Sequence, residues 1–201
     1  MLARVLLAVR YLLDRLSGPR SRAYELLALR RRLLAEARPG RASPAEEQLA
    51  ARLRELRERL AARLGQVEAC AHCVPPPSPG WPGGQCCSAK TEGLFSEHEL
   101  AALRLAGTTP GHLRPPPGEH RGCAFRGPSG CSLAVAHRPS VCVGYACREH
   151  LAELRRRGDG PAIARLQDEL QMVFKRFVAA RAARLELTLF DELKAGLLEA
   201  K

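Results

Sequence analysis

The chain has 201 residues, of which 46% are hydrophobic, and a formal net charge of +11. A chain of this length can bury a core of its own, so it does not need the disulfide staples of small secreted domains, and it has no run of about 18 apolar residues that could span a membrane. Only 4% of the residues are aromatic and no recognition-helix or RNA-binding motif is present, which argues against nucleic acid as the partner.

Residues 1–66 predict three basic, leucine-striped helices. Residues 2–16 place apolar side chains on one helical stripe, and residues 22–37 repeat the pattern before Pro39-Gly40 ends it. The third helix opens with a capping box from Ser43 to Glu46 and keeps three- and four-residue steps up to Val67. We expect these helices to pack within the chain, and a protein partner or a homodimer through their surface is the alternative.

Residues 67–157 predict an irregular, loop-rich module. Residues 74–84 contain five prolines and three glycines, which exclude a helix or a central strand. A short helix follows from the cap at Ser96 to about Ala106, and residues 133–136 can pair briefly as a strand. The rest of this segment is too rich in Gly, Pro and Ser for long regular elements.

Residues 158–201 predict a C-terminal amphipathic helix region. A long helix starts after Gly160-Pro161 and places apolar residues from Ile163 to Val178 on one face. Leucines alternate between 185 and 189, which is also typical of a strand, but we expect a helix here, with Thr188 able to cap a last helix. The predicted fold class is therefore mainly α, with a cysteine-cluster metal module flanked by N-terminal and C-terminal amphipathic helices.

The cysteines of the chain are confined to its middle, while both flanking regions have none. Two groups of four fit thiolates that bind zinc or iron, because a soft, deprotonated sulfur is a preferred ligand of both metals. The predicted metal ligands are Cys70, Cys73, Cys86, Cys87, Cys123, Cys131, Cys142 and Cys147. How they divide between metal centres stays open at this point.

Three alternatives concern the same residues. A disulfide framework is disfavoured, because a bridge between the adjacent Cys86 and Cys87 would close a strained ring, and we expect a reducing, cytoplasmic location. A dithiol oxidoreductase site at Cys70-x-x-Cys73 lacks the strand and helix that usually surround such a motif. Either His72 or His150 can replace a cysteine at a zinc site.

Arginines near the cysteines have a predicted local role. Eight bound thiolates would carry more negative charge than one or two metal centres cancel, so we expect neighbouring arginines to offset it. These are Arg121, Arg126, Arg138 and Arg148. No nucleotide-binding loop, HExxH helix or nucleophile elbow is present, so the sequence assigns no reaction and leaves open whether the protein is an enzyme.

The cysteine pattern resembles the YkgJ-like, or CxxCxxCC, family of cysteine-cluster proteins, which are described as zinc- or iron-chelating. The first half of the resemblance is Cys70-Ala-His-Cys73, Cys86-Cys87 and the short helix after them. Its second half is Cys123-Ala-Phe, Gly130-Cys131-Ser, Arg138-Pro139-x-x-Cys142 and Tyr145-Ala-Cys147. Twelve residues separate Cys73 from Cys86, more than the family usually has.

The resemblance covers residues 70–147 and implies metal chelation without a defined reaction. The expected function is a metal-binding protein that uses zinc or iron, with an iron-sulfur cluster as one form of the iron. The alternatives are an iron-sulfur protein with an electron-transfer or protein-modification role, and an adaptor that binds an anionic partner through its basic helices. Residues 1–66 and 158–201 lie outside the resemblance.

Overall fold

The computed structural model describes residues 22–36, 42–64, 91–116, 123–127, 130–145 and 148–199, and the described part is mainly helical, as predicted. Its long helices are a helix of residues 22–35, α2 (Pro44–Leu64), α5 (Glu97–Leu105), α7 (Arg148–Arg157) and α8 (Gly160–Glu199). The shorter elements are α4 (Thr91–Leu94), α6 (Ser140–Gly144), the 3-10 helices η2 (Pro110–His112) and η3 (Val135–His137), and the strands β1 (Arg126–Gly127) and β2 (Gly130–Cys131).

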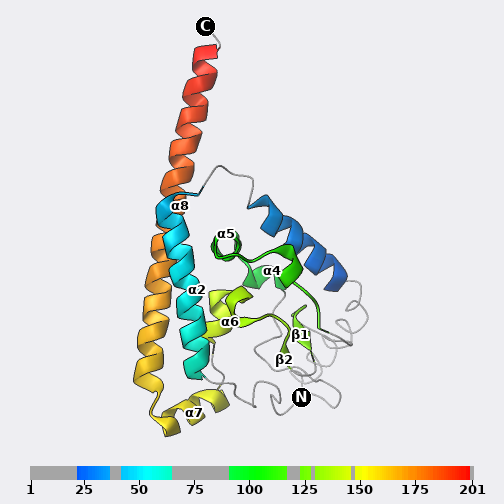
Figure 1. The fold of residues 1–201 in the computed structure, drawn as a ribbon, viewed down its shortest axis with the longest axis vertical. Coiled ribbons are helices and arrows are strands. Elements are labelled where there is room, and N and C mark those ends of the chain that lie inside the picture. The colour runs from blue at the N-terminus through cyan, green and yellow to red at the C-terminus, as the bar shows by residue number, and fades with distance from the viewer. Residues whose placement is uncertain are drawn as a thin grey trace, which may run out of the picture.

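The scaffold is a pair of antiparallel helices, α2 and α8, which lie side by side along most of α2 (Figure 1). The leucine stripe predicted for α2 is buried against the apolar face predicted for α8, because both repeat at helical spacing. The core between them also receives residues of α5, α6 and α7. Its members are Ala50, Leu53, Leu56, Leu60, Leu64, Ala101, Ala102, Val143, Leu154, Ile163, Leu166, Leu170, Val173 and Phe177.

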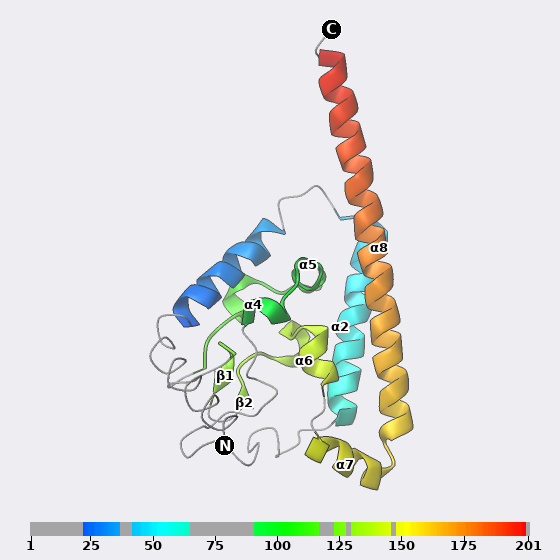
Figure 2. The ribbon, with the colours of Figure 1, turned by 180° about the vertical axis from the view of Figure 1, so that it is seen from behind.

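A second core lies between the helix of residues 22–35 and the cysteine-bearing segments. Phe95 and Phe125 pack there with ring centroids 5.9 Å apart and planes tilted by 56°. The other buried members are Leu26, Leu29, Leu33, Leu100, Leu103, Leu113, Cys123, Ala124 and Leu133. Neighbouring residues of α5 thus enter different cores, and this short helix joins the two halves of the molecule, as the reverse view also shows (Figure 2).

The two predicted helix starts differ in how they are capped. At α2 the capping box is complete, because the Ser43 hydroxyl accepts the Glu46 N–H at 3.2 Å and the Glu46 carboxylate accepts the Ser43 N–H at 2.8 Å. At α5 the Ser96 hydroxyl accepts the Glu99 N–H at 3.2 Å, but the Glu99 carboxylate is turned elsewhere. Glu99 is therefore free to take part in a tertiary contact.

Two sequence expectations are corrected, and one helix was not expected. Residues 133–136 are not a strand, since residues 135–137 form η3, and the strand pair that does form is the short β1–β2 ladder with Arg126 opposite Cys131. Helix α7 was not predicted. Thr188 caps no separate helix, because it lies inside the continuous α8 and its hydroxyl donates to the Arg184 carbonyl at 3.0 Å.

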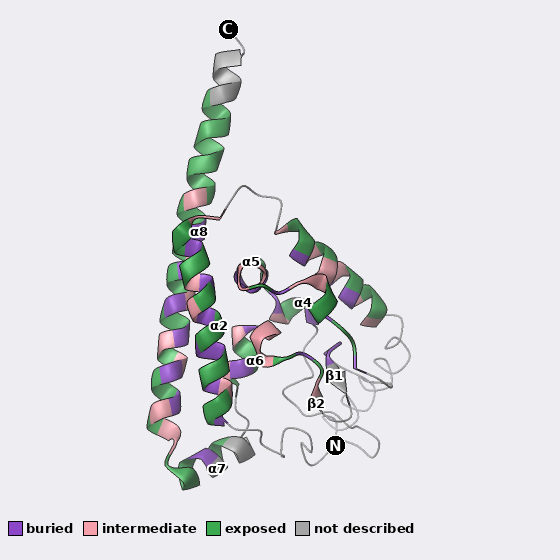
Figure 3. Cartoon of the chain, viewed as in Figure 1, coloured by how far each residue is buried: buried purple, intermediate pink, exposed green. Residues whose placement is uncertain are grey.

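Other expectations fall outside the described residues: the helix of residues 2–16, the end of the third helix at Val67, and the loop of residues 74–84. Within the described ranges, no helix is both long enough and apolar enough to cross a membrane. The last part of α8 extends beyond the body of the protein and is exposed on all sides up to residue 194 (Figure 3).

Candidate metal centre

Three of the eight predicted ligands belong to the described residues: Cys123, Cys131 and Cys142. All three are free thiols. Cys70, Cys73, Cys86, Cys87 and Cys147 lie outside the described residues, and so does His72. His150 lies in α7, but the structure does not describe its side chain. The described part of the candidate centre therefore comprises three cysteines of the second group.

Cys123 is buried at the edge of the second core, just before β1. Thr91 of α4 lies beside it, and its hydroxyl accepts the Ala124 N–H at 2.9 Å and is 4.0 Å from the Cys123 sulfur. The backbone N–H of Phe125 also donates to that sulfur. Burial raises the pKa of the Cys123 thiol, and these two donors oppose the rise. A buried sulfur that accepts hydrogen bonds can be a stable thiolate when a metal cation is bound to it.

Cys131 is placed by the short ladder of β1 and β2. It pairs with Arg126, and the next residue, Ser132, donates its N–H to the Phe125 carbonyl at 2.8 Å. The partly buried Cys131 packs against the same core that contains Cys123. The ladder thus brings two cysteines that are eight positions apart in sequence to one edge of that core.

Cys142 reaches the same region from α6. Gly144 of this helix accepts a hydrogen bond from the Gln167 side chain of α8 at 2.8 Å, and Val143 enters the core between α2 and α8. Although solvent reaches part of its side chain, the surrounding protein raises the pKa of the Cys142 thiol to about 12, chiefly by desolvation. The rigid scaffold therefore fixes the backbone of this third cysteine.

The three sulfurs are close enough to affect one another. Negative charge on Cys123 and Cys131 raises the pKa of Cys142, and charge on Cys131 raises that of Cys123. Arg138 opposes this effect at Cys142. Three thiols whose thiolates repel one another are a donor set that a soft cation would stabilise.

Within the described ranges, no three His, Cys, Asp or Glu side chains are already arranged to hold a metal ion. The donor chemistry nevertheless fits zinc or iron, since both prefer thiolates and Cys123 has a buried sulfur with N–H and O–H donors around it. The fourth cysteine of this group, Cys147, is three residues beyond Gly144 in sequence.

A buried ion pair anchors the segment that carries Cys142. Arg57 of α2 donates from Nη2 to Glu99 of α5 at 2.7 Å, and their side chains are 0% and 9% exposed. The other Glu99 oxygen accepts the N–H of Ser140 at 3.0 Å, and Arg57 also donates to the Ser140 hydroxyl at 3.2 Å. Three elements thus meet at the start of α6, two residues before Cys142.

Sequence reasoning missed these supporting residues. Glu99 resembles an ordinary capping residue, and Arg57 resembles one more surface charge on a basic helix. Thr91 carries no pattern of its own. The one available indication is that Arg57 falls on the buried side of the α2 leucine stripe, directly after Leu56.

The structure does not test the other three arginines that were expected to offset thiolate charge. Arg121 lies outside the described residues, and the side chains of Arg126 and Arg148 are not described. The helix of residues 22–35 contributes charges that were not expected, because Arg22 and Glu25 both interact electrostatically with Cys123. This helix therefore lies against the cysteine region, although the family resemblance does not include it.

Together these residues place three free thiols between a helical scaffold and a short β ladder. No protein-family model, curated protein or solved structure matches the chain.

Proposed function

We propose that the protein binds zinc or iron through its cysteine cluster. In this proposal Cys123, Cys131, Cys142 and Cys147 form one group of ligands, and Cys70, Cys73, Cys86 and Cys87 form the other. The observation that carries the proposal is that three free thiols influence one another electrostatically. Two of them, Cys123 and Cys131, lie at the second core, and the third, Cys142, lies on α6. The resemblance to the YkgJ-like family on residues 70–147 belongs to the same proposal.

The surroundings of the thiols support this function. A structural role for free cysteines would not require three of them at one place, since buried cysteines otherwise behave as small apolar residues. Here Thr91 and the Phe125 N–H direct donors to the Cys123 sulfur, and Arg138 offsets charge at Cys142. Free thiols in this arrangement also favour the reducing cytoplasm as the location.

The metal can be identified on the full chain, purified anaerobically, by elemental analysis together with a visible absorption spectrum. Zinc gives a colourless protein, whereas an iron-sulfur cluster gives a brown protein with iron and matching sulfide. Removing the metal with a chelator should unfold the cysteine region, because the ligands hold its loops together. A chain that contains no metal under these conditions, and takes up neither ion after reduction, contradicts the proposal.

An adaptor role is a second candidate, and one observation favours it. A cavity of about 560 Å³ between α2 and α8 is lined by three arginines, Arg59, Arg63 and Arg165, and by one acidic residue, Glu169. Arg63 lies 3.9 Å from its nearest carboxylate, on Asp159, so its charge is only weakly neutralised. Binding of a labelled polyglutamate peptide that weakens at high salt and in Arg59→Gln with Arg165→Gln supports this role; no binding at low salt contradicts it.

A further inference from the structure

We infer that the protein forms a homodimer in which the exposed distal part of α8 in each copy packs on the helix of residues 22–35 of the other copy. This distal segment comprises residues 185–194. Both surfaces expose apolar side chains that have no partner within the described residues, and the net charges of the two segments are opposite.

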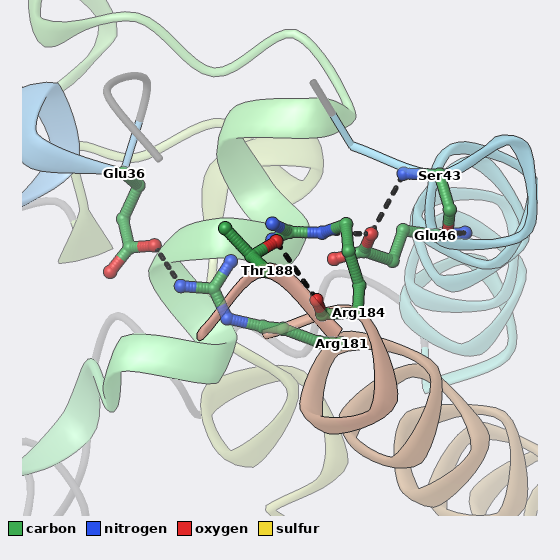
Figure 4. A network of polar contacts seen from close by, with 6 residues as sticks. All are labelled: Glu36, Ser43, Glu46, Arg181, Arg184 and Thr188. Carbon is green, nitrogen blue, oxygen red and sulfur yellow. Dashed lines mark hydrogen bonds and ion pairs between the residues drawn. The ribbon is translucent and has the colours of Figure 1, made fainter. Parts of the chain in front are cut away.

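The distal segment begins where α8 loses its last contacts with the body of the protein. Arg181 pairs with Glu36, and Arg184 donates from Nε to the Glu46 carboxylate at 2.6 Å, next to the cap of α2 (Figure 4). Arg181 is the last buried residue of the helix up to residue 194, and every residue from 185 to 194 is exposed. The two ion pairs fix the direction in which the segment leaves the body.

The distal segment is far more apolar than a solvated helix end needs to be. Leu185, Leu189 and Leu193 follow one another at four-residue steps and therefore share one face of the helix. Phe190 borders that face and is 66% exposed. Contiguous exposed apolar side chains of this kind mark a protein interaction site.

The same segment is acidic. Glu186 and Glu192 flank the apolar face, Asp191 lies beyond it, and Lys194 is the only basic residue between 185 and 194. The segment therefore has a net charge of −2, three acidic residues against one basic, in a chain whose total is +11. A basic partner surface is the complement that such a face requires.

The outer face of the helix of residues 22–35 supplies the apolar half of that complement. Leu27 and Leu34 are exposed, and Tyr24 is 73% exposed, while the opposite face of the same helix is buried in the second core. Residues 24, 27, 31 and 34 follow one another at three- and four-residue steps, so they share one side of the helix. This side therefore offers exposed apolar contacts to a partner.

The same helix supplies the positive charge. Residues 22–35 contain four arginines and one glutamate, which gives a net charge of +3. Arg31 is exposed on the outer face, between the two exposed leucines. Arg30 and Arg32 on either side of it are partly buried and donate to the backbone carbonyls of Leu113 and Phe95 at 2.7 and 2.8 Å, so they add positive charge at the edges of the outer face. An acidic helix can therefore dock on this face with charge complementarity.

A second copy supplies both complements at once, because the two faces belong to the same chain but lie apart within it. α8 is one continuous helix, and both views show its distal part running away from the body (Figures 1 and 2). Exchange between two copies places an acidic face on a basic face twice. This reciprocity is what a twofold interface provides.

The test uses two charge-altered full-length chains with reducing agent present, measured by size-exclusion chromatography with light scattering. One chain carries Glu186→Lys with Glu192→Lys. The other carries Arg31→Glu with Ala23→Glu, since residue 23 is exposed and lies two helical turns before Arg31 on the same side. The wild type should have twice the 22.0 kDa mass of one chain. The lysine variant gives residues 185–194 a net charge of +2 opposite a basic helix, and the glutamate variant places two carboxylates on the outer face and lowers the net charge of residues 22–35 to 0 opposite an acidic segment. Each variant alone should therefore fall to the single mass.

An equimolar mixture of the two variants should return to the double mass, since each altered face then meets its complement and the two unaltered faces also meet. A control with Lys175→Glu and Arg176→Glu, which are exposed elsewhere on α8, should stay dimeric. All altered residues are exposed, and far-UV circular dichroism checks that each variant keeps its helix content. Three outcomes overturn the inference: a monomeric wild type, variants that stay dimeric alone, or a mixture that stays monomeric. A monomeric wild type would assign the two faces to another partner or to residues 1–21.

Discussion

Replacing Glu99 by Gln should destabilise the protein far more than its single side-chain change suggests. Glu99 compensates the charge of Arg57, whose side chain is 0% exposed, at an Nη2 to Oε2 distance of 2.7 Å. The glutamine amide is nearly the same size as the carboxylate it replaces, but it leaves the guanidinium buried without a counter-charge. Breaking one side of a buried pair in this way costs about 3–5 kcal/mol.

The exposed pair of Arg54 and Glu58 is the matched control, because it lies on α2 like Arg57, with both side chains nearly half exposed and 3.1 Å apart. Glu58→Gln should cost only about 0.3–0.5 kcal/mol. Urea unfolding followed by circular dichroism measures both free energies. With a slope of about 2 kcal/mol per molar urea, Glu99→Gln should lower the midpoint by roughly 1.5–2.5 M.

Combining Arg57→Met with Glu99→Gln should recover much of the lost stability, because the uncompensated charge is then removed as well. The metal content of every variant is measured alongside, so that a loss of metal is not mistaken for a loss of the ion pair. A Glu99→Gln chain that unfolds at the same urea concentration as Glu58→Gln would refute the reasoning.

Three further predictions follow from contacts around the site and the scaffold. Thr91→Val should cost about 1–3 kcal/mol in urea unfolding, because the buried Ala124 N–H loses its acceptor, and a loss no larger than that of an exposed Thr188→Val would contradict this. Ser43→Ala should lower the free energy of unfolding by about 1 kcal/mol, because it removes one half of the α2 capping box. Ser132→Ala removes an exposed hydrogen bond and should lower it by less. The reverse order would count against the capping argument. Burial, together with the nearby positive charges of His112 and Arg54, lowers the pKa of His137 below its usual value of about 6.5. The folded chain therefore binds fewer protons than the unfolded chain, and the free energy of unfolding should fall as the pH drops below about 6.5. In thermal unfolding between pH 7 and pH 5, His137→Gln should show a weaker pH dependence than the wild type, and an unchanged slope would rule out this contribution.

Periodicity and capping were enough to predict the scaffold. The α2 leucines and the α8 apolar face repeat at helical spacing, and the Ser43 to Glu46 cap fixes where α2 begins. Helix α7 was missed because its residues are mostly charged, so that no apolar stripe marks it. Residues 133–136 resembled a strand because they are apolar, but the neighbouring turn through Arg138-Pro139 favours the 3-10 geometry of η3.

The candidate site was predictable only in its chemistry. Thiol spacing identifies Cys123, Cys131 and Cys142 as ligands, but it cannot show that the helix of residues 22–35 contributes charged side chains to their surroundings. Nor could it identify the Arg57 and Glu99 pair, whose members are 42 positions apart in sequence. Contacts between distant segments depend on how helices pack, and local patterns carry no information about that.

The metal content of Cys142→Ser, compared with wild type and with a matched control, tests the central claim most directly. Val141→Ser is the control, because it introduces the same residue at the neighbouring, exposed position of α6. Elemental analysis of the anaerobically purified proteins should find less zinc or iron per chain in Cys142→Ser and an unchanged amount in Val141→Ser. Equal metal content in all three proteins, or none in the wild type, would contradict the account.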